Sequence, residues 1–94
     1  GLIDSVTDAE ILAAYKLLAR TEGIFCEPAS AASVAGLTKL RLNGTIPGDK
    51  SVVCIITGTG LKDPELAMNI AGTPLQELPP DITELREIIA KLVP

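Results

Sequence analysis

The sequence predicts an α/β fold that is an incomplete piece of a larger domain, with helices packed on one or two parallel strands. Helix signals open and close the chain, and the run SVVCII at Ser51–Ile56 lies between them. A run that is β-branched and apolar throughout is typical of a strand buried on both faces of a parallel sheet. Such a sheet needs more strands than these 94 residues supply.

The first element is predicted from Asp8 to Glu22. Thr7 and Glu10 have the T-x-x-E spacing of a capping box, in which each side chain bonds the other residue's backbone amide. Apolar residues at helical spacing follow, and Gly23 is placed to end the helix.

A second helix is predicted from Glu27-Pro28 to about Leu42, after the short apolar run Ile24–Cys26. Its first turns contain mostly alanine, serine and glycine. Residues this small allow another backbone or a flat ligand to approach the helix closely. From the residues alone, tight packing against a sheet is the preferred explanation over contact with a ligand.

The polar segment TGTGLKDP follows the predicted strand, and a short helix is expected from about Pro64 to Asn69. A loop from Gly72 to Pro80 leads to a last helix, which Asp81 caps and where Glu84 completes a second capping-box spacing. The apolar stripe of this helix is formed by Ile82, Leu85, Ile88, Ile89 and Leu92.

Composition excludes several classes of function. A net charge of −4 and only two aromatic residues argue against a nucleic-acid partner. The chain has no histidine, which removes the commonest general base and most zinc sites. No apolar run is long enough to cross a membrane, so we expect a cytoplasmic protein. Cys26 and Cys54 lack a CxxC spacing and are expected to be buried free thiols.

A glycine-rich loop at the carboxyl end of a buried parallel strand is where open α/β sheets bind ligands. The loop Thr57–Gly60 has this position, but it lacks the spacing of a dinucleotide fingerprint and the ending of a P-loop. Without further information, a tight turn whose hydroxyl caps the next helix explains it equally well.

Two motifs give the loop a more specific meaning. GIFCEPASAASVA at Gly23–Ala35 and CIITGTGLKDP at Cys54–Pro64 together resemble the carboxy-terminal part of the threonine synthase family. The resemblance covers roughly residues 6 to 72. It implies a pyridoxal phosphate (PLP) enzyme of fold type II, the tryptophan synthase β-like fold. Residues 1–94 are then expected to be a single unit, the carboxy-terminal part of the large catalytic domain.

The resemblance also implies cofactor-binding residues. Thr57 corresponds to a threonine that donates a hydrogen bond to the pyridine nitrogen of PLP, and Gly58 lies beside it. Glu27 corresponds to a residue near the ring, although a carboxylate that stabilises the start of a helix is an equal alternative. Ala29 and Ser30 are expected to border the ring or the substrate through their small size.

The family's Schiff-base lysine lies far upstream, so no catalytic residue is expected in this chain. Lys62 is interpreted as a loop cation. The implied reaction converts O-phosphohomoserine and water to threonine and phosphate, and the 94 residues alone are expected to be inactive. The expected partners are the remainder of the enzyme chain and a second copy of it. Another fold-type-II PLP enzyme, such as threonine dehydratase, and a non-catalytic interaction module are the alternatives.

Overall fold

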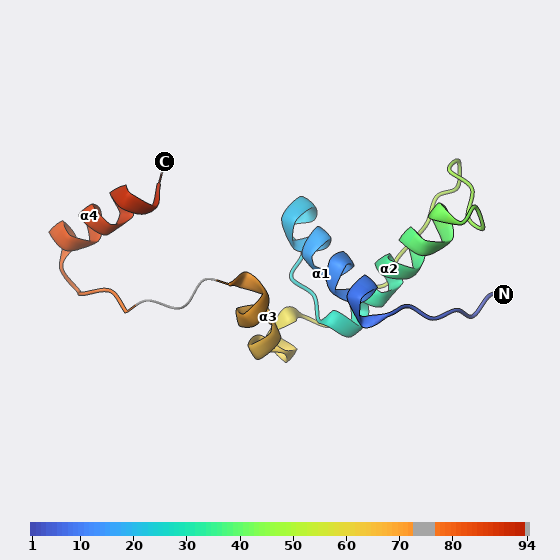
Figure 1. Ribbon diagram of the computed structural model, residues 1–94, viewed down its shortest axis with the longest axis horizontal. Helices are drawn as coiled ribbons and strands as arrows, with labels where there is room; N and C mark the ends of the chain where they lie inside the picture. The colour runs from blue at the N-terminus through green and yellow to red at the C-terminus, as the bar shows by residue number, and fades with distance from the viewer. Residues whose placement is uncertain (73–76, 94) are drawn as a thin grey trace.

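Helices account for the regular structure of this chain (Figure 1). The computed structural model describes residues 1–72 and 77–93. Within them lie four α-helices and one short 3-10 turn, η1 (Gly60–Lys62). The helices are α1 (Asp8–Glu22), α2 (Pro28–Leu42), α3 (Pro64–Ala71) and α4 (Ile82–Leu92).

The ends of the helices follow the predicted capping signals. Thr7 Oγ1 accepts a hydrogen bond from the Glu10 amide at 3.2 Å, and Glu10 Oε1 accepts one from the Thr7 amide at 2.9 Å. Gly23 ends α1 in the left-handed conformation, with φ at 66°. Asp81 caps α4 by accepting from the amides of Thr83 and Glu84. The predicted bounds of α1 and α2 are confirmed, and α3 extends two residues beyond its predicted end.

The core lies between α1 and α2. Ala31 is fully buried and Ala35 nearly so, and their small side chains let α1 approach α2 closely. The Tyr15 ring meets the Phe25 ring edge to face, with centroids 6.5 Å apart. The small residues of α2 therefore pack on a helix, whereas the sequence suggested packing on a sheet. The buried apolar residues are Ala14, Tyr15, Leu18, Cys26, Ala31 and Ala35.

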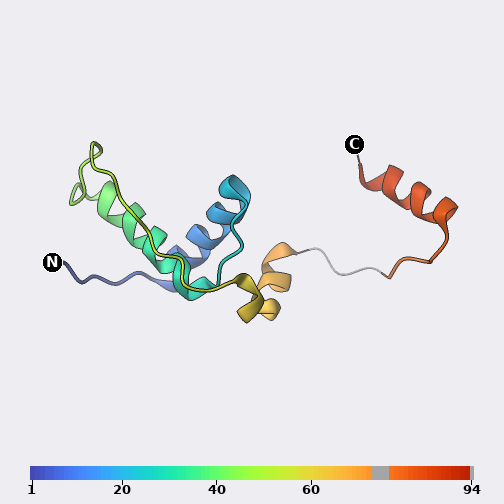
Figure 2. The ribbon, with the colours of Figure 1, turned by 180° about the vertical axis from the view of Figure 1, so that it is seen from behind.

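The strand predicted at Ser51–Ile56 is not formed, so the α/β class and its parallel strands are not confirmed. Residues 51–57 return along α2 without regular structure (Figure 2). Two long side-chain contacts link this segment to α2. Cys54 Sγ donates to the Ser33 carbonyl at 3.8 Å, and Ser33 Oγ, whose shorter bond of 3.0 Å goes to the Ser30 carbonyl, lies 3.4 Å from the Ile55 carbonyl. A strand exists only through backbone pairing with a neighbour, and no backbone hydrogen bond joins residues 51–56 to another described segment.

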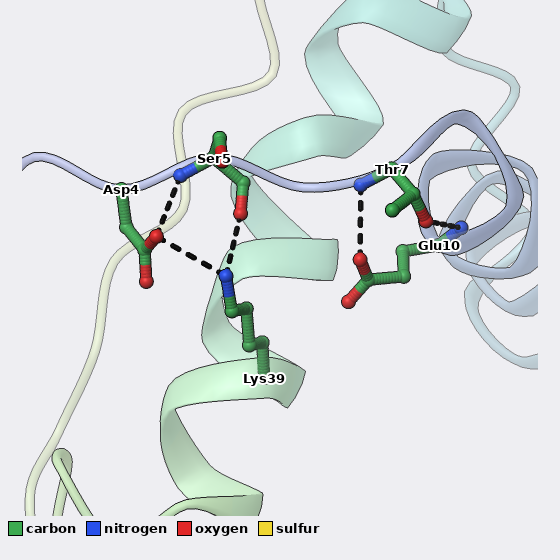
Figure 3. Close-up of polar contacts among 5 residues, drawn as sticks. All are labelled: Asp4, Ser5, Thr7, Glu10 and Lys39. Carbon is green, nitrogen blue, oxygen red and sulfur yellow. Dashed lines mark hydrogen bonds and ion pairs between the residues drawn. The ribbon is translucent and has the colours of Figure 1, made fainter.

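The residues before α1 are also attached to α2 (Figure 3). Lys39 Nζ donates to Asp4 Oδ1 at 3.1 Å and to the Ser5 carbonyl at 2.8 Å. A hydrogen bond from the Ser5 amide and one from the Lys39 ammonium lower the pKa of the Asp4 carboxyl. The Lys39 ammonium thus attaches the amino-terminal segment to α2.

The chain as a whole is extended. Its radius of gyration is 18.1 Å, whereas about 12 Å is expected for a compact domain of this length. Helix α4 lies apart from the α1–α2 pair (Figure 1) and contains no buried residue. Of the loop predicted before it, residues 73–76 lie outside the described residues. Much of the apolar surface of the described residues is therefore exposed.

Candidate functional site

Two backbone hydrogen bonds bring the two sequence motifs together. The Glu27 amide donates to the Gly58 carbonyl at 2.9 Å, and the Gly60 amide donates to the Phe25 carbonyl at 3.0 Å. They form an isolated antiparallel bridge centred on Cys26 and Thr59. This bridge holds the TGTG loop against the start of α2, although about thirty residues separate the two segments in sequence.

Side chains from both motifs meet at this bridge. Thr57 Oγ1 donates to Glu27 Oε1 at 3.1 Å, and Lys62 Nζ lies 3.7 Å from Glu27 Oε2. The Glu27 side chain is only 19% exposed, whereas the Lys62 side chain is 62% exposed. Because Glu27 Oε1 contacts the Thr57 hydroxyl and Oε2 faces the Lys62 ammonium, the carboxylate lies between a hydroxyl and a cation. We call Glu27, Thr57 and Lys62 the carboxylate cluster.

The Glu27 side chain does not cap α2. Glu27 occupies the position before the helix, but its carboxylate forms no capping hydrogen bond. Its backbone carbonyl accepts instead from the amide and the hydroxyl of Ser30, at 3.1 and 3.0 Å. No hydrogen bond therefore supports the alternative in which the Glu27 carboxylate stabilises the start of α2.

Gly58 is needed here for space. A Cβ atom at this position would lie 2.5 Å from Glu27 Oε1 and 2.9 Å from Lys62 Nζ. Gly60 is similar, because a Cβ there would overlap the Phe25 ring. The absence of side chains at these two positions allows Glu27 and Phe25 to lie against the loop backbone.

Ala29 and Ser30 have different surroundings from each other. Ser30 is buried, and its hydroxyl donates to the Glu27 carbonyl one helical turn back. Ala29 is exposed and borders a shallow hollow between α1, α2 and α3. The hollow is lined by Asp8, Ile11, Leu12, Pro28, Ala29 and Leu66. The structure therefore joins Glu27, Thr57 and Gly58, whereas Ala29 faces a separate hollow.

Sequence reasoning missed the role of Lys62, which it interpreted as a loop cation. The side chain is indeed exposed, yet its ammonium pairs with the largely buried carboxylate of Glu27. The T-x-x-x-x-K spacing in a glycine-rich loop gave no signal for this, because Glu27 approaches from another segment. Among the described residues no group of three or more metal-binding side chains occurs. No described helix is long and apolar enough to cross a bilayer.

Comparison with known proteins identifies the family of this chain. The sequence model of the pyridoxal-phosphate dependent enzymes matches residues 1–58, which include Glu27 and Thr57. The chain belongs to the pyridoxal-phosphate dependent enzyme family. Members of this family depend on PLP.

Within this family the chain is similar to curated threonine synthases. It is 56% identical to the threonine synthase of Halalkalibacterium halodurans over 86% of its length, and 52% identical to that of Synechocystis sp. over 97%. The threonine synthase of Methanocaldococcus jannaschii is 50% identical over 98% of this chain. The chain spans only 22 to 23% of the length of these relatives.

Proposed function

We propose that this chain is the carboxy-terminal segment of a threonine synthase. The observation that carries the proposal is identity of 50 to 56% to three threonine synthases over 86 to 98% of the chain. The proposed enzyme converts O-phospho-L-homoserine and water to L-threonine and phosphate with PLP. We place it in the cytoplasm as a homodimer, and we expect these 94 residues to be inactive alone.

The residues of the carboxylate cluster fit one edge of PLP. A pyridine nitrogen needs one hydrogen-bond partner, and the exposed Thr57 hydroxyl can supply it. Gly58 leaves the loop without a side chain at the next position, and the Glu27 carboxylate occupies the space beside it. Lys62 is paired with Glu27. We therefore assign the lysine that bonds PLP, and the PLP phosphate site, to the remainder of the enzyme chain.

In the proposed enzyme, PLP supplies an electron sink for charge that develops on the amino-acid substrate. We propose that residues of this segment position the PLP ring. Thr57 would contact the ring nitrogen, and Glu27, which accepts a hydrogen bond from the Thr57 hydroxyl, would hold that side chain in position. The backbone bridge between Glu27 and Gly58 fixes both residues relative to α2. Positioning of this kind lowers the reorganisation needed during the reaction.

The test is an activity assay of the full-length protein that carries this segment. With PLP, we expect phosphate release from O-phosphohomoserine with formation of an equal amount of threonine. Replacement of Thr57 by Val should lower kcat by about two- to tenfold, because one hydrogen bond between neutral groups contributes about 0.5 to 1.5 kcal/mol. Deamination of threonine without phosphate release would instead indicate a dehydratase and overturn the proposal.

A further inference from the structure

Asn43 and Gly44 form the turn that ends α2. Asn43 follows the last residue of the helix, and Gly44 has a left-handed backbone conformation, with φ at 81°. Both residues are exposed. A Cβ atom at Gly44 would meet no other atom within 4 Å, so the space around its backbone is open. Solvent therefore reaches this turn freely.

The side chain of Asn43 is folded over the peptide that follows it. Asn43 Oδ1 accepts a hydrogen bond from the Thr45 amide at 3.0 Å, the contact with which asparagine often stabilises a turn. This contact keeps the side-chain carbonyl carbon, Cγ, close to the Gly44 nitrogen rather than extended into solvent. Because Gly44 has no side chain, nothing on that residue blocks the approach of its nitrogen to Cγ.

Only a weak contact holds the Gly44 nitrogen back. Its amide donates to the Arg41 carbonyl at 3.2 Å, at the long end of the range for a hydrogen bond. The ψ angle of Asn43 is 0°, so a rotation about its Cα–C bond must bring the nitrogen to Cγ. Exposed turns open in this way at little cost in free energy.

We propose that Asn43-Gly44 is a site of spontaneous deamidation, at which Asn43 is converted to aspartate and isoaspartate. The Gly44 nitrogen loses its proton to solvent and bonds Cγ, which closes a succinimide ring. The bond from Cγ to Nδ2 breaks, and Nδ2 takes a proton from solvent and leaves as ammonia. This modification is independent of the proposed function.

Water then opens the ring at either of its two carbonyl carbons. Breakage of the new bond between Cγ and the Gly44 nitrogen gives aspartate. Breakage of the bond from that nitrogen to the main-chain carbonyl carbon gives isoaspartate, in which the chain runs through the former side chain. No atom is oxidised or reduced, and solvent water is the only co-reactant.

Both products change the region between the two motifs. Each places a negative charge at the carboxyl end of α2, where the helix dipole disfavours it. Isoaspartate also adds a carbon atom to the main chain between α2 and residues 51–57, which lead back along the helix to Thr57.

The experiment uses the full-length enzyme that carries this segment, kept in warm neutral buffer. Peptide mass spectrometry follows the conversion of each asparagine amide to an acid. Asn69 is the internal control, because it is also exposed but lies within α3 and precedes the β-branched Ile70. We expect Asn43 to react about tenfold faster than Asn69 or more, because a helical turn must first open at Asn69. Isoaspartate should be among the products, since direct hydrolysis of the amide gives aspartate alone.

A synthetic peptide of residues 38–50 gives the rate of the open turn. We expect the folded enzyme to react at a rate within about tenfold of the peptide's, because the turn opens easily. A much slower reaction in the enzyme would show that the folded protein protects the turn, and it would overturn the inference.

Asn43→Gln is the matched variant. It keeps a side-chain amide, but attack by the Gly44 nitrogen would have to close a larger ring, so this position should stay unconverted. Conversion of Asn43→Gln at the wild-type rate would contradict the ring mechanism. Equal rates at Asn43 and Asn69, or aspartate without isoaspartate at position 43, would overturn it as well, and neither result requires a variant.

Discussion

At the scale of single residues, two glycines shape the candidate site by leaving space. Neither Gly58 nor Gly60 has the positive φ that would require glycine for backbone reasons. Each instead lies under a side chain from the other motif, Gly58 under Glu27 and Gly60 under Phe25. Because the Glu27 carboxylate ends a flexible side chain and the Phe25 ring is bulky, the two positions should respond differently to an added methyl group.

We predict that Gly58→Ala displaces the Glu27 carboxylate with little loss of stability, whereas Gly60→Ala costs about 1 to 3 kcal/mol through overpacking against Phe25. Gly36→Ala is the matched control. A Cβ there meets no atom within 4 Å, and alanine in a helix interior stabilises by about 0.5 to 1 kcal/mol relative to glycine.

Urea denaturation of the full-length enzyme gives these stabilities, and a crystal structure of the Gly58→Ala variant shows whether the Glu27 carboxylate is displaced. A larger loss of stability in Gly58→Ala than in Gly60→Ala would contradict the different roles assigned to them.

At the scale of elements, the start of α1 depends on an ionised carboxylate. Hydrogen bonds from the Thr7 amide, and then from its side chain, lower the pKa of the Glu10 carboxyl below its ordinary value of 4.5. A lowered pKa means that the ionised form stabilises the folded helix start above that ordinary value. The stabilisation is lost as the pH falls through the lowered pKa.

We therefore predict that acidification from about pH 5 to about pH 3 frays the first turn of α1. Protection of the Thr7 amide from hydrogen exchange, measured by NMR across this range, checks the expectation. Glu10→Gln keeps an oxygen that accepts from this amide but does not titrate, so its protection should vary much less with pH.

Asp4 lies before α1 and also has a lowered pKa, so it too changes charge under acid conditions. Asp4→Asn is therefore the second control, and it should leave the pH dependence at Thr7 in place. If Glu10→Gln and the wild type lose protection over the same pH range, the capping carboxylate is not the cause.

At the scale of the whole molecule, many large apolar side chains of the described residues are exposed. Val53 is 90% exposed and Ile3 is 99% exposed. The apolar stripe of α4 has no buried member. Large exposed apolar patches mark surfaces that contact another body. The remainder of a longer enzyme chain is the body that the proposed function supplies.

We predict that the 94 residues expressed alone associate and bind a hydrophobic dye. Size-exclusion chromatography with light scattering, together with dye fluorescence, measures both properties. The full-length enzyme, at equal concentration of subunits, is the comparison and should bind much less dye. A monodisperse monomer of the short chain that binds no dye would show that its apolar surface needs no partner.

Much of the local structure could be predicted from the sequence, because local interactions decide it. The capping box at Thr7 and the glycine at position 23 fixed the ends of α1 where the structure has them, and the Asp81 cap fixed the start of α4. The free, buried state of Cys26 also followed, whereas Cys54 is only partly buried. The helix ends depend on residues a few positions apart, and the apolar run around Cys26 indicated its burial.

Only the tertiary structure decided the features that depend on distant partners. The apolar run Ser51–Ile56 has every local signal of a strand, yet without a neighbouring strand its backbone remains irregular. Conversely, no local pattern joins Glu27 to Thr57 and Lys62. That cluster exists because two backbone hydrogen bonds bring together segments about thirty residues apart. The sequence by itself determined the helices and the two motifs, and the tertiary structure determined how the side chains of those motifs meet.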